Sequence, residues 1–363
     1  MQAENENEVK TRIFRVSEEN FNAVLDEAAA IIRNGGTVAF PTETVYGLGA
    51  NGMNPEAVRK IFEAKKRPSG NPLSLLVHSK EDLKKIAKNV PENALKLMDV
   101  FWPGPLTIVL EKKDSVPDIT SGNLQSIGVR MPDHKIPLEL IKRAGTPLAA
   151  PSANLSGKPS PTLAAHVISD LTGRIDAIID GGKAAIGLES TVIDMTVEPP
   201  IVLRPGAVGI EALERIIGKV EAGYKDEKAT TDNEILKNRA GQKYRHYIPG
   251  TKVVLVEGES KAVSEKIVEL LENYRSNGQK VGLLLSKETA KLPVFEGFDS
   301  ENRFLLGSRE KPEGAARKLF EGLRSLDRKG LDVILADGSF SCSGLGDALI
   351  NRLREASSLR FAI

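Results

Sequence analysis

Hydroxyl side chains recur in four short segments that also carry Gly or Pro, and three of these segments contain Lys or Arg as well. These segments are residues 40–72, 126–132, 147–161 and 187–192. In the first, Thr42 and Thr44 follow an apolar run, and Lys65-Lys66-Arg67-Pro68 follows a helix-like stretch. Guanidinium and ammonium groups bind carboxylate and phosphate oxygens, and hydroxyls orient small polar molecules. The sequence therefore predicts a site that holds both a small polar substrate and a polyphosphate.

Each of these candidates also has a purely structural interpretation. The hydroxyl of Thr42 can satisfy loose backbone donors in a turn. Lys65 and Arg67 end a predicted helix, where cations interact favourably with the helix dipole. Arg130 lies in a predicted buried strand and needs a partner there, because an unpaired buried charge is costly. An internal ion pair would supply that partner, so both interpretations of these residues stay open.

Familiar cofactor motifs are absent or out of context. Residues 47–52 match G-x-G-x-x-G, but these glycines lie six or more residues after the preceding strand, and no strand-end acid follows. A nicotinamide site is therefore disfavoured, and the chain contains no G-x-x-x-x-G-K-[ST] phosphate loop. The four histidines have no metal-ligand spacing, so no zinc site from protein side chains is expected.

Composition limits the remaining classes of function. The 363 residues exceed one ordinary core, so two domains are expected. With 50 basic and 49 acidic residues, the chain lacks the basic excess typical of proteins that bind nucleic acid mainly through phosphates. The single cysteine, Cys342, fits a reducing cytoplasm. The polar N-terminus is unlike a signal peptide, and no apolar run is long enough to span a bilayer.

Periodicity predicts the elements that must position these groups. Helices are expected from Ser17 to Gly35, from Asn54 to about Lys65, and near 80–88, 92–101, 136–144 and 162–171. Strand-like runs such as 37–41, 106–112 and 126–131 interleave with them, partly as direct neighbours. This mixture indicates an N-terminal mixed, twisted α/β sheet over residues 12–218.

The C-terminal part has a different pattern. Residues 219–250 are charged and poor in apolar periodicity, so they are expected to be a linker. Strands and helices then alternate strictly over 251–363, which predicts a smaller parallel, Rossmann-like α/β domain. Residues 343–346, at the start of its last helix, match the pattern of an anion site, although most such turns are only helix starts.

The four polar segments resemble those of the threonylcarbamoyl-AMP synthases, the Sua5/YrdC/TsaC family. The segments that carry the resemblance are FPTETVYGLG, KKRPSGN, SIGVRMP, APSANLSGKPSP and GLESTV. The tail is similar to that of the two-domain Sua5 branch. The resemblance implies synthesis of threonylcarbamoyl-AMP and pyrophosphate from L-threonine, bicarbonate and ATP, with Mg²⁺ on the phosphates. The product would serve t6A37 modification of tRNAs that read ANN codons, through downstream tRNA threonylcarbamoyl transferase machinery and with at most a weak tRNA contact.

The resemblance also implies roles for individual residues. Lys65 and Arg67 would be the catalytic cations. L-threonine would be bound by Thr42, His78, Arg130, Ala150 and Ser190. ATP would be bound by Lys65, Arg67, Ser69, Asn71, Ser126, Ser152, Asn154, Ser160, Arg204 and Lys243. Ser160-Pro161 also has the pattern of a helix N-cap, which leaves a structural role open for Ser160.

The linker carries the run Lys243-Tyr244-Arg245-His246-Tyr247, which in Sua5 proteins lies where the linker folds over the active site. Here it follows Arg239-Ala240-Gly241-Gln242 instead of the usual S-P-G-M. The linker is nevertheless predicted to cover the site. The alternatives are a double-stranded RNA-binding or regulatory YrdC-type module, and a carbamoyltransferase relative, whose zinc-ribbon cysteines this chain lacks.

Overall fold

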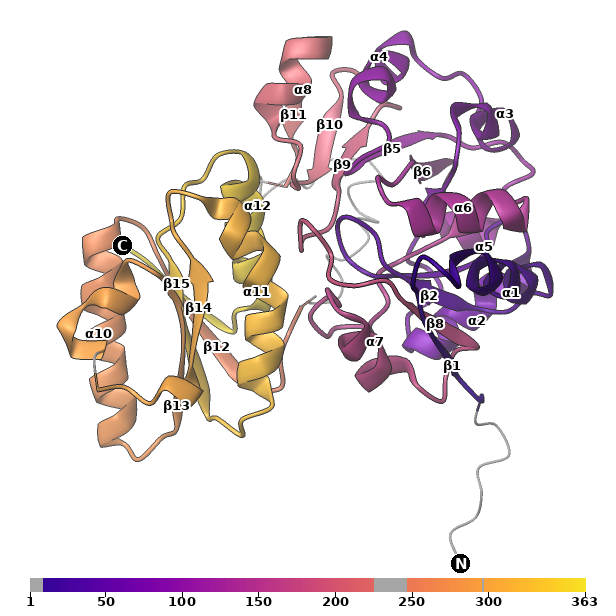
Figure 1. Cartoon of the computed structure of the whole chain (residues 1–363). Helices are drawn as coiled ribbons and strands as arrows, with labels where there is room; N and C mark the ends of the chain where they lie inside the picture. The colour runs from indigo at the N-terminus through magenta and orange to yellow at the C-terminus, as the bar shows by residue number, and fades with distance from the viewer. Residues whose placement is uncertain (1–8, 225–246, 296) are drawn as a thin grey trace, which may run out of the picture.

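The computed structural model of the chain describes residues 9–224, 247–295 and 297–363. Within these ranges the strands form two separate sheets, one built from the N-terminal part and one from the C-terminal part (Figure 1). The predicted combination of a mixed sheet and a smaller parallel sheet is confirmed. No helix in the described ranges is long and apolar enough to cross a membrane.

The N-terminal sheet has the strand order β1-β8-β2-β3-β7-β4-β6-β5-β9-β10-β11. It mixes both orientations, since β5 pairs antiparallel with β6 and parallel with β9. The strands are β1 (Arg12–Arg15), β2 (Val38–Phe40), β3 (Gly47–Asn51), β4 (Leu75–Leu76), β5 (Leu106–Glu111), β6 (Ser126–Arg130), β7 (Leu148–Ala149), β8 (Ala177–Asp180), β9 (Thr191–Asp194), β10 (Ile201–Arg204) and β11 (Glu221–Ala222).

Helices cover this sheet and were largely predictable. They are α1 (Phe21–Arg33), α2 (Pro55–Lys65), α3 (Leu83–Ile86), α4 (Glu92–Phe101), α5 (Asp118–Ser121), α6 (Lys135–Ala144), α7 (Ala164–Leu171) and α8 (Ile210–Ile217). Asn54 caps α2 as expected, accepting from the backbone N–H groups of Glu56 and Ala57. Ser17 was the wrong start for α1, which begins at Phe21 after Asn20 because Ser17 and Asn20 bond each other in a preceding turn.

The glycine run 47–52 forms a strand rather than a ligand loop. β3 is buried and pairs antiparallel with β2, so that Gly49 lies opposite Val38. A Cβ at Gly49 would lie 2.5 Å from the Phe40 ring, and one at Gly52 would lie 2.3 Å from Leu75. These glycines are therefore required by close packing within the sheet.

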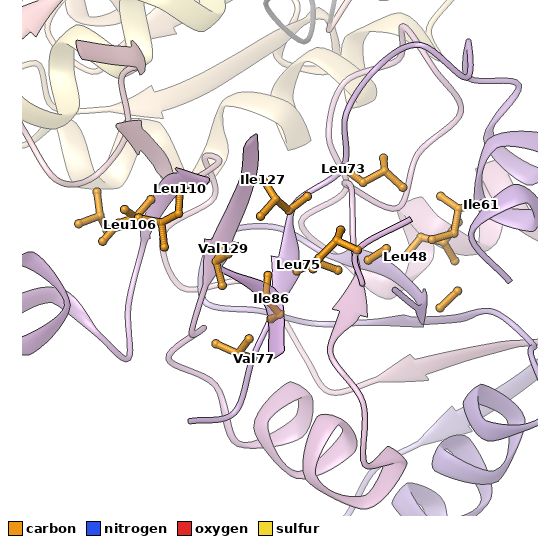
Figure 2. Close-up of a cluster of buried hydrophobic side chains, with 14 of the residues drawn as sticks. Leu48, Ile61, Leu73, Leu75, Val77, Ile86, Leu106, Leu110, Ile127 and Val129 are labelled. Atoms are coloured by element: carbon orange, nitrogen blue, oxygen red, sulfur yellow. The ribbon is translucent and has the colours of Figure 1, made fainter. Parts of the chain in front are cut away.

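The central strands β4, β5 and β6 alternate between two environments. Leu75, Leu106, Leu110, Ile127 and Val129 point into one apolar cluster, together with Ile86 and Val77 (Figure 2). Successive residues of a strand point to opposite faces, so the residues between them face the other side of the sheet. That other face carries the polar groups described below.

The C-terminal sheet is parallel throughout, with the order β14-β13-β15-β12-β16. Its strands are β12 (Lys252–Glu257), β13 (Val281–Ser286), β14 (Arg303–Gly307), β15 (Val333–Gly338) and β16 (Leu359–Ala362). Helix α10 (Ser260–Ser276) covers one face, and α11 (Pro312–Asp327) and α12 (Gly344–Ala356) cover the other (Figure 1). Short 3₁₀ turns, not the single short helix expected, connect β13 to β14.

Helices α11 and α12 lie on the side of the C-terminal sheet that faces the N-terminal domain (Figure 1). Arg324 of α11 pairs with Asp170 at 2.6 Å, and Arg352 of α12 pairs with Glu189 at 2.8 Å. All four side chains are largely buried. The two domains are thus joined by buried ion pairs, in which removal of either partner would leave an uncompensated charge.

Candidate functional site

A cavity of about 1110 Å³ brings together most of the predicted site residues. Its lining includes side chains from both domains, with α12 forming one wall. The predicted residues that line it are Thr42, Arg67, Ser126, Arg130, Ala150, Ser152, Asn154, Ser160, Ser190 and Arg204. This volume is large enough for a drug-sized ligand.

Strand alternation explains how the cavity floor is built. In β6, Ser126, Gly128 and Arg130 line the cavity, whereas Ile127 and Val129 are in the core. The neighbouring β5 presents Thr107 in the same way. A Cβ at Gly128 would approach the Thr107 side chain to 3.1 Å and the Ser74 hydroxyl to 2.9 Å, so glycine lets these strands carry a continuous polar surface.

Arg130 is both internally paired and available to a ligand. Its Nη2 lies 2.6 Å from Glu43 Oε1, and its Nε donates to the Gly104 carbonyl at 3.1 Å. The contact with Glu43 is an ion pair without hydrogen-bond geometry, since both Glu43 oxygens and Arg130 Nη2 lack hydrogen-bond partners. The structural interpretation of Arg130 is therefore correct, and Arg130 also lines the cavity, where its positive charge suits a carboxylate.

The turn at Thr42 likewise serves the backbone and the cavity at once. Thr42 Oγ1 donates to the Val45 carbonyl at 2.6 Å and lies 2.9 Å from Thr44 Oγ1. The same oxygen accepts from the backbone N–H groups of Thr44 and Val45. These bonds hold a tight turn directly after β2, with Thr42 and Thr44 both on the cavity wall.

Lys65 lies behind the cavity wall rather than on it. Its ammonium donates to the Asn154 carbonyl at 2.5 Å and to the Ser152 carbonyl, and its side chain is almost fully buried. Burial, reinforced by the neighbouring charge of Arg67, holds the pKa of Lys65 well below its usual value. In this arrangement Lys65 fixes the loop that carries Ser152 and Asn154.

Arg67 does reach the cavity. Its Nη2 donates to the Pro72 carbonyl at 3.3 Å, while its Nε has no hydrogen-bond partner. Burial, aided by the nearby Arg204 and opposed by Tyr247, lowers the pKa of Arg67 to about 10, so it stays protonated at neutral pH. A buried cation with an unfilled donor is well suited to an anionic ligand.

Ser190 and Arg204 form one unit at the ends of β9 and β10. Arg204 donates through Nε and Nη2 to the Ser190 carbonyl at 3.0 and 2.9 Å, and through Nη2 to its hydroxyl at 3.0 Å. Thr107 lies 2.7 Å from the same hydroxyl. Ser190 and Arg204, assigned to different ligands from the sequence, are therefore in direct contact.

Several predicted residues do not line the cavity. Ser69 is exposed, Asn71 is partly exposed, and His78 Nδ1 lies 2.6 Å from Asp82 Oδ2. Lys243 lies outside the described residues, as do Tyr244 and His246 of the linker run. Tyr247 is described and buried against Phe320, with ring centroids 5.1 Å apart.

Sequence reasoning missed two contributions to the site. Glu189 lines the cavity and accepts the Ser160 hydroxyl. Ser160 is thus not the cap of α7, which begins at Ala164 after Leu163. The second contribution is the α12 wall, which includes Asp347, Asn351 and Glu355. Their i, i+4, i+8 spacing marks one helix face, but which face meets another domain cannot be read from it.

The fold and the cavity define a two-domain α/β protein with a cavity lined by arginines and hydroxyl side chains. A family model described as telomere recombination matches residues 30–206, and one described as threonylcarbamoyl-AMP synthase, C-terminal domain, matches 208–358. The threonylcarbamoyl-AMP synthase of Pyrococcus abyssi is 48% identical over 333 residues, which cover 92% of this chain and 94% of that protein. That of Bacillus subtilis is 43% identical over 336 residues, covering 92% and 93%.

Solved structures agree. The crystal structure of P. abyssi Sua5 complexed with L-threonine has a TM-score of 0.87 at 45% identity, covering 97% of this chain and 99% of that one. The chain belongs to the threonylcarbamoyl-AMP synthase family, in its two-domain Sua5 form. The resemblance carried by the polar segments is thereby confirmed.

Proposed function

We propose that this protein is an L-threonylcarbamoyladenylate synthase, a nucleotidyltransferase that forms threonylcarbamoyl-AMP and pyrophosphate from L-threonine, bicarbonate and ATP. The observation that carries the proposal is the cavity itself. It unites three arginines, Arg130, Arg67 and Arg204, with a row of hydroxyls. Relatives of similar length carry the same name, and one of them is solved with L-threonine.

The reaction implied by the family uses these charges to bind and orient its substrates. Arg130 binds the threonine carboxylate beside Thr42, Ala150 and Ser190. The threonine amine attacks bicarbonate and, with loss of water, gives a carbamate, whose oxygen attacks the α-phosphate of ATP and displaces pyrophosphate. No protein nucleophile takes part, so the protein contributes orientation and positive charge around the phosphates. Arg67 and Arg204 supply that charge, and Lys65 positions the loop that carries Ser152 and Asn154.

Magnesium would enter with the nucleotide. Mg²⁺ prefers to keep several waters and to bind phosphate oxygens with few protein ligands. Glu189, a carboxylate on the cavity wall, is already bonded to Arg352 and Ser160. Mg²⁺ would therefore be held mainly by the nucleotide, since the described residues contain no group of three or more His, Cys, Asp or Glu side chains that could bind a metal ion.

The domain boundaries and the cellular setting are part of the proposal. Residues 12–218 form the catalytic domain, 251–363 the C-terminal domain, and 219–250 the segment between them, the start of which still belongs to the N-terminal sheet because β11 pairs with β10. The product passes to tRNA threonylcarbamoyl transferase machinery in the cytoplasm for t6A37 modification, and any contact of this protein with tRNA itself is weak.

The test is pyrophosphate release from ATP. Release should require both L-threonine and bicarbonate, and omission of either should reduce it to background. ATP turnover that does not depend on threonine would contradict the proposal. A mobility-shift assay with double-stranded RNA at physiological salt addresses the alternative: tight binding together with no synthesis would favour an RNA-binding module.

A further inference from the structure

Arg352 of α12 is a C-terminal-domain side chain that is completely buried at the edge of the N-terminal site. Its Nε donates to Glu189 Oε2 at 2.8 Å, its Nη2 donates to the Pro205 carbonyl at 3.0 Å, and its Nη1 donates to Asn351 at 2.6 Å. The Tyr247 ring centroid lies 5.6 Å from the guanidinium carbon. One guanidinium thus contacts two separate segments of the other domain.

These two segments are the ones that carry Ser190 and Arg204. Glu189 directly precedes Ser190, and Pro205 directly follows Arg204. Arg204 itself bonds the Ser190 carbonyl, so that pair is held from one side by its own bonds and from the other by Arg352. The planar, forked guanidinium suits this double contact, because its donors point in fixed and divergent directions.

Glu189 also bonds a further residue of the cavity wall, Ser160. Its Oε2 accepts from Arg352, and its Oε1 accepts the Ser160 hydroxyl. Burial alone would raise the pKa of Glu189, but the charges of Arg352 and Arg204 outweigh it and hold the pKa below its usual value. Glu189 is therefore ionised, and Arg352 compensates its negative charge at the wall of a site for an anionic substrate.

We infer that Arg352 is a positioning residue for nucleotide binding, which acts from the C-terminal domain through Glu189 and Pro205. It orients Ser160 and the Ser190–Arg204 unit, and it prevents the Glu189 carboxylate from repelling the ATP phosphates. This inference rests on the proposed function. It gives the C-terminal domain a direct part in building the site.

A second interdomain arginine provides the matched control. Arg324 of α11 is also largely buried, and it pairs with Asp170 at 2.6 Å and with the Pro159 carbonyl. Asp170 does not line the cavity, whereas Glu189 does. Loss of either arginine should loosen the domain contact, but only loss of Arg352 should leave an uncompensated carboxylate in the site.

The experiment compares Arg352→Gln, Arg324→Gln and the double variant Arg352→Gln/Glu189→Gln in the full-length protein. Pyrophosphate release gives KM for ATP and for threonine, and thermal unfolding reports stability. We expect Arg352→Gln to raise KM for ATP roughly tenfold with a much smaller change for threonine, since one buried charge interaction is lost. The double variant should recover most of the ATP affinity, because it removes the uncompensated charge.

Several results would overturn the inference. One is an unchanged KM for ATP in folded Arg352→Gln, and another is an equal rise in Arg324→Gln. A double variant as impaired as Arg352→Gln would exclude the charge effect. If Arg352→Gln does not fold, Arg352→Lys replaces it, with an intermediate KM expected and a wild-type KM contradicting us. Absence of threonine-dependent turnover in the wild type would instead contradict the proposed function.

Discussion

Two polar clusters lie at strand ends in this protein, one in each domain, and they differ in how completely their groups are satisfied. The N-terminal cluster opens into the cavity around Arg130, Arg67 and Arg204. The C-terminal cluster lies at the carboxyl ends of β13 and β15, where the chain leaves in opposite directions towards β14 and β16. Open parallel sheets commonly bind ligands at such a point.

The C-terminal cluster is nearly closed on itself. Asp337 is fully buried and accepts four bonds, from the backbone N–H and hydroxyl of both Ser286 and Ser339. Arg309 donates to the hydroxyls of Ser286 and Thr289. Burial would raise the pKa of Asp337, but the bonds from Ser286 and Ser339 hold it below its usual value. Only Arg309 Nε remains without a hydrogen bond there.

The cavity cluster retains unused hydrogen-bonding capacity. Arg67 Nε is a buried donor on the cavity wall without a hydrogen-bond partner. Arg130 and Glu43 satisfy each other's charge as an ion pair at 2.6 Å, but Arg130 Nη2 and both Glu43 oxygens make no hydrogen bond. A buried donor is costly to leave unpaired, so Arg67 beside the cavity indicates a place for a ligand oxygen. Location at the carboxyl ends of parallel strands would, on its own, favour the C-terminal cluster as the binding site. The state of the polar groups separates a binding site from a structural network.

Arg130→Ala is the variant expected to have the largest effect on the open cluster. A charge-assisted bond to carboxylate contributes about 1.5–3 kcal/mol, so threonine affinity should fall roughly ten- to a hundredfold while ATP affinity changes little. Calorimetric titration with each ligand measures this. Arg59→Ala, on the exposed face of α2, is the control. Unchanged threonine affinity in a folded Arg130→Ala protein would remove Arg130 from the site.

Arg67→Ala should affect the nucleotide instead, raising KM for ATP about tenfold through loss of one phosphate contact. Lys66→Ala should have little effect, because Lys66 is exposed at the left-handed C-cap of α2. Lys65→Ala should lower both thermal stability and ATP affinity, since it removes the support of the 152–154 loop. Steady-state kinetics and thermal unfolding test all three variants. Equal, small effects of all three substitutions would favour the interpretation that these cations only interact with the end of the α2 helix.

Asp337→Asn tests the closed cluster. The amide places a donor opposite the donors of Ser286 or Ser339, which should lower the free energy of unfolding by about 1–2 kcal/mol. KM for ATP and threonine should stay unchanged. Chemical denaturation combined with kinetics separates the two effects. A selective rise in either KM would show that this cluster also takes part in substrate binding.

The sequence predicted the two sheets because their periodicity is local. Strict alternation over 251–363 predicts parallel βαβ units, and Asn54-Pro55 is a local helix start. Most cavity residues were predicted through family resemblance, since the chemistry at Thr42, Arg130 and Arg204 depends on neighbours distant in sequence.

The failures have non-local causes. β3 was missed because its glycines are required by Phe40 and Leu75, which lie outside the local pattern. The helix cap considered as an alternative role for Ser160 was wrong, because its hydroxyl is bonded to Glu189, 29 residues away. The α12 wall depends on the contact between domains, which sequence patterns do not record. In each of these cases the role of the residue depends on the residue that it contacts, which is distant in sequence, more than on its own type.

The smallest expected effect is a pH dependence of the free energy of unfolding, and it comes from His166 of α7. This side chain is hydrogen-bonded and lies beside the interdomain pair of Arg324 and Asp170. Its Nδ1 accepts from the backbone N–H of Thr162, which requires a neutral ring. Burial, with the positive charge of Arg324 as the next cause, lowers the pKa of His166 from 6.5 to about 4. Protonation therefore favours the unfolded chain. The stabilisation is complete above pH 6.5 and is lost as the pH falls from 6.5 towards 4.

Between pH 7.5 and 5.5 this one group should reduce the free energy of unfolding by about 1 kcal/mol. His166→Gln, whose side-chain oxygen can accept the same bond but does not titrate, should remove that part of the pH dependence. Denaturation curves of both proteins at several pH values measure it, with His134→Gln as a second histidine variant for comparison. Parallel pH profiles for wild type and His166→Gln would contradict the assignment, and would show that the interdomain network tolerates a protonated ring.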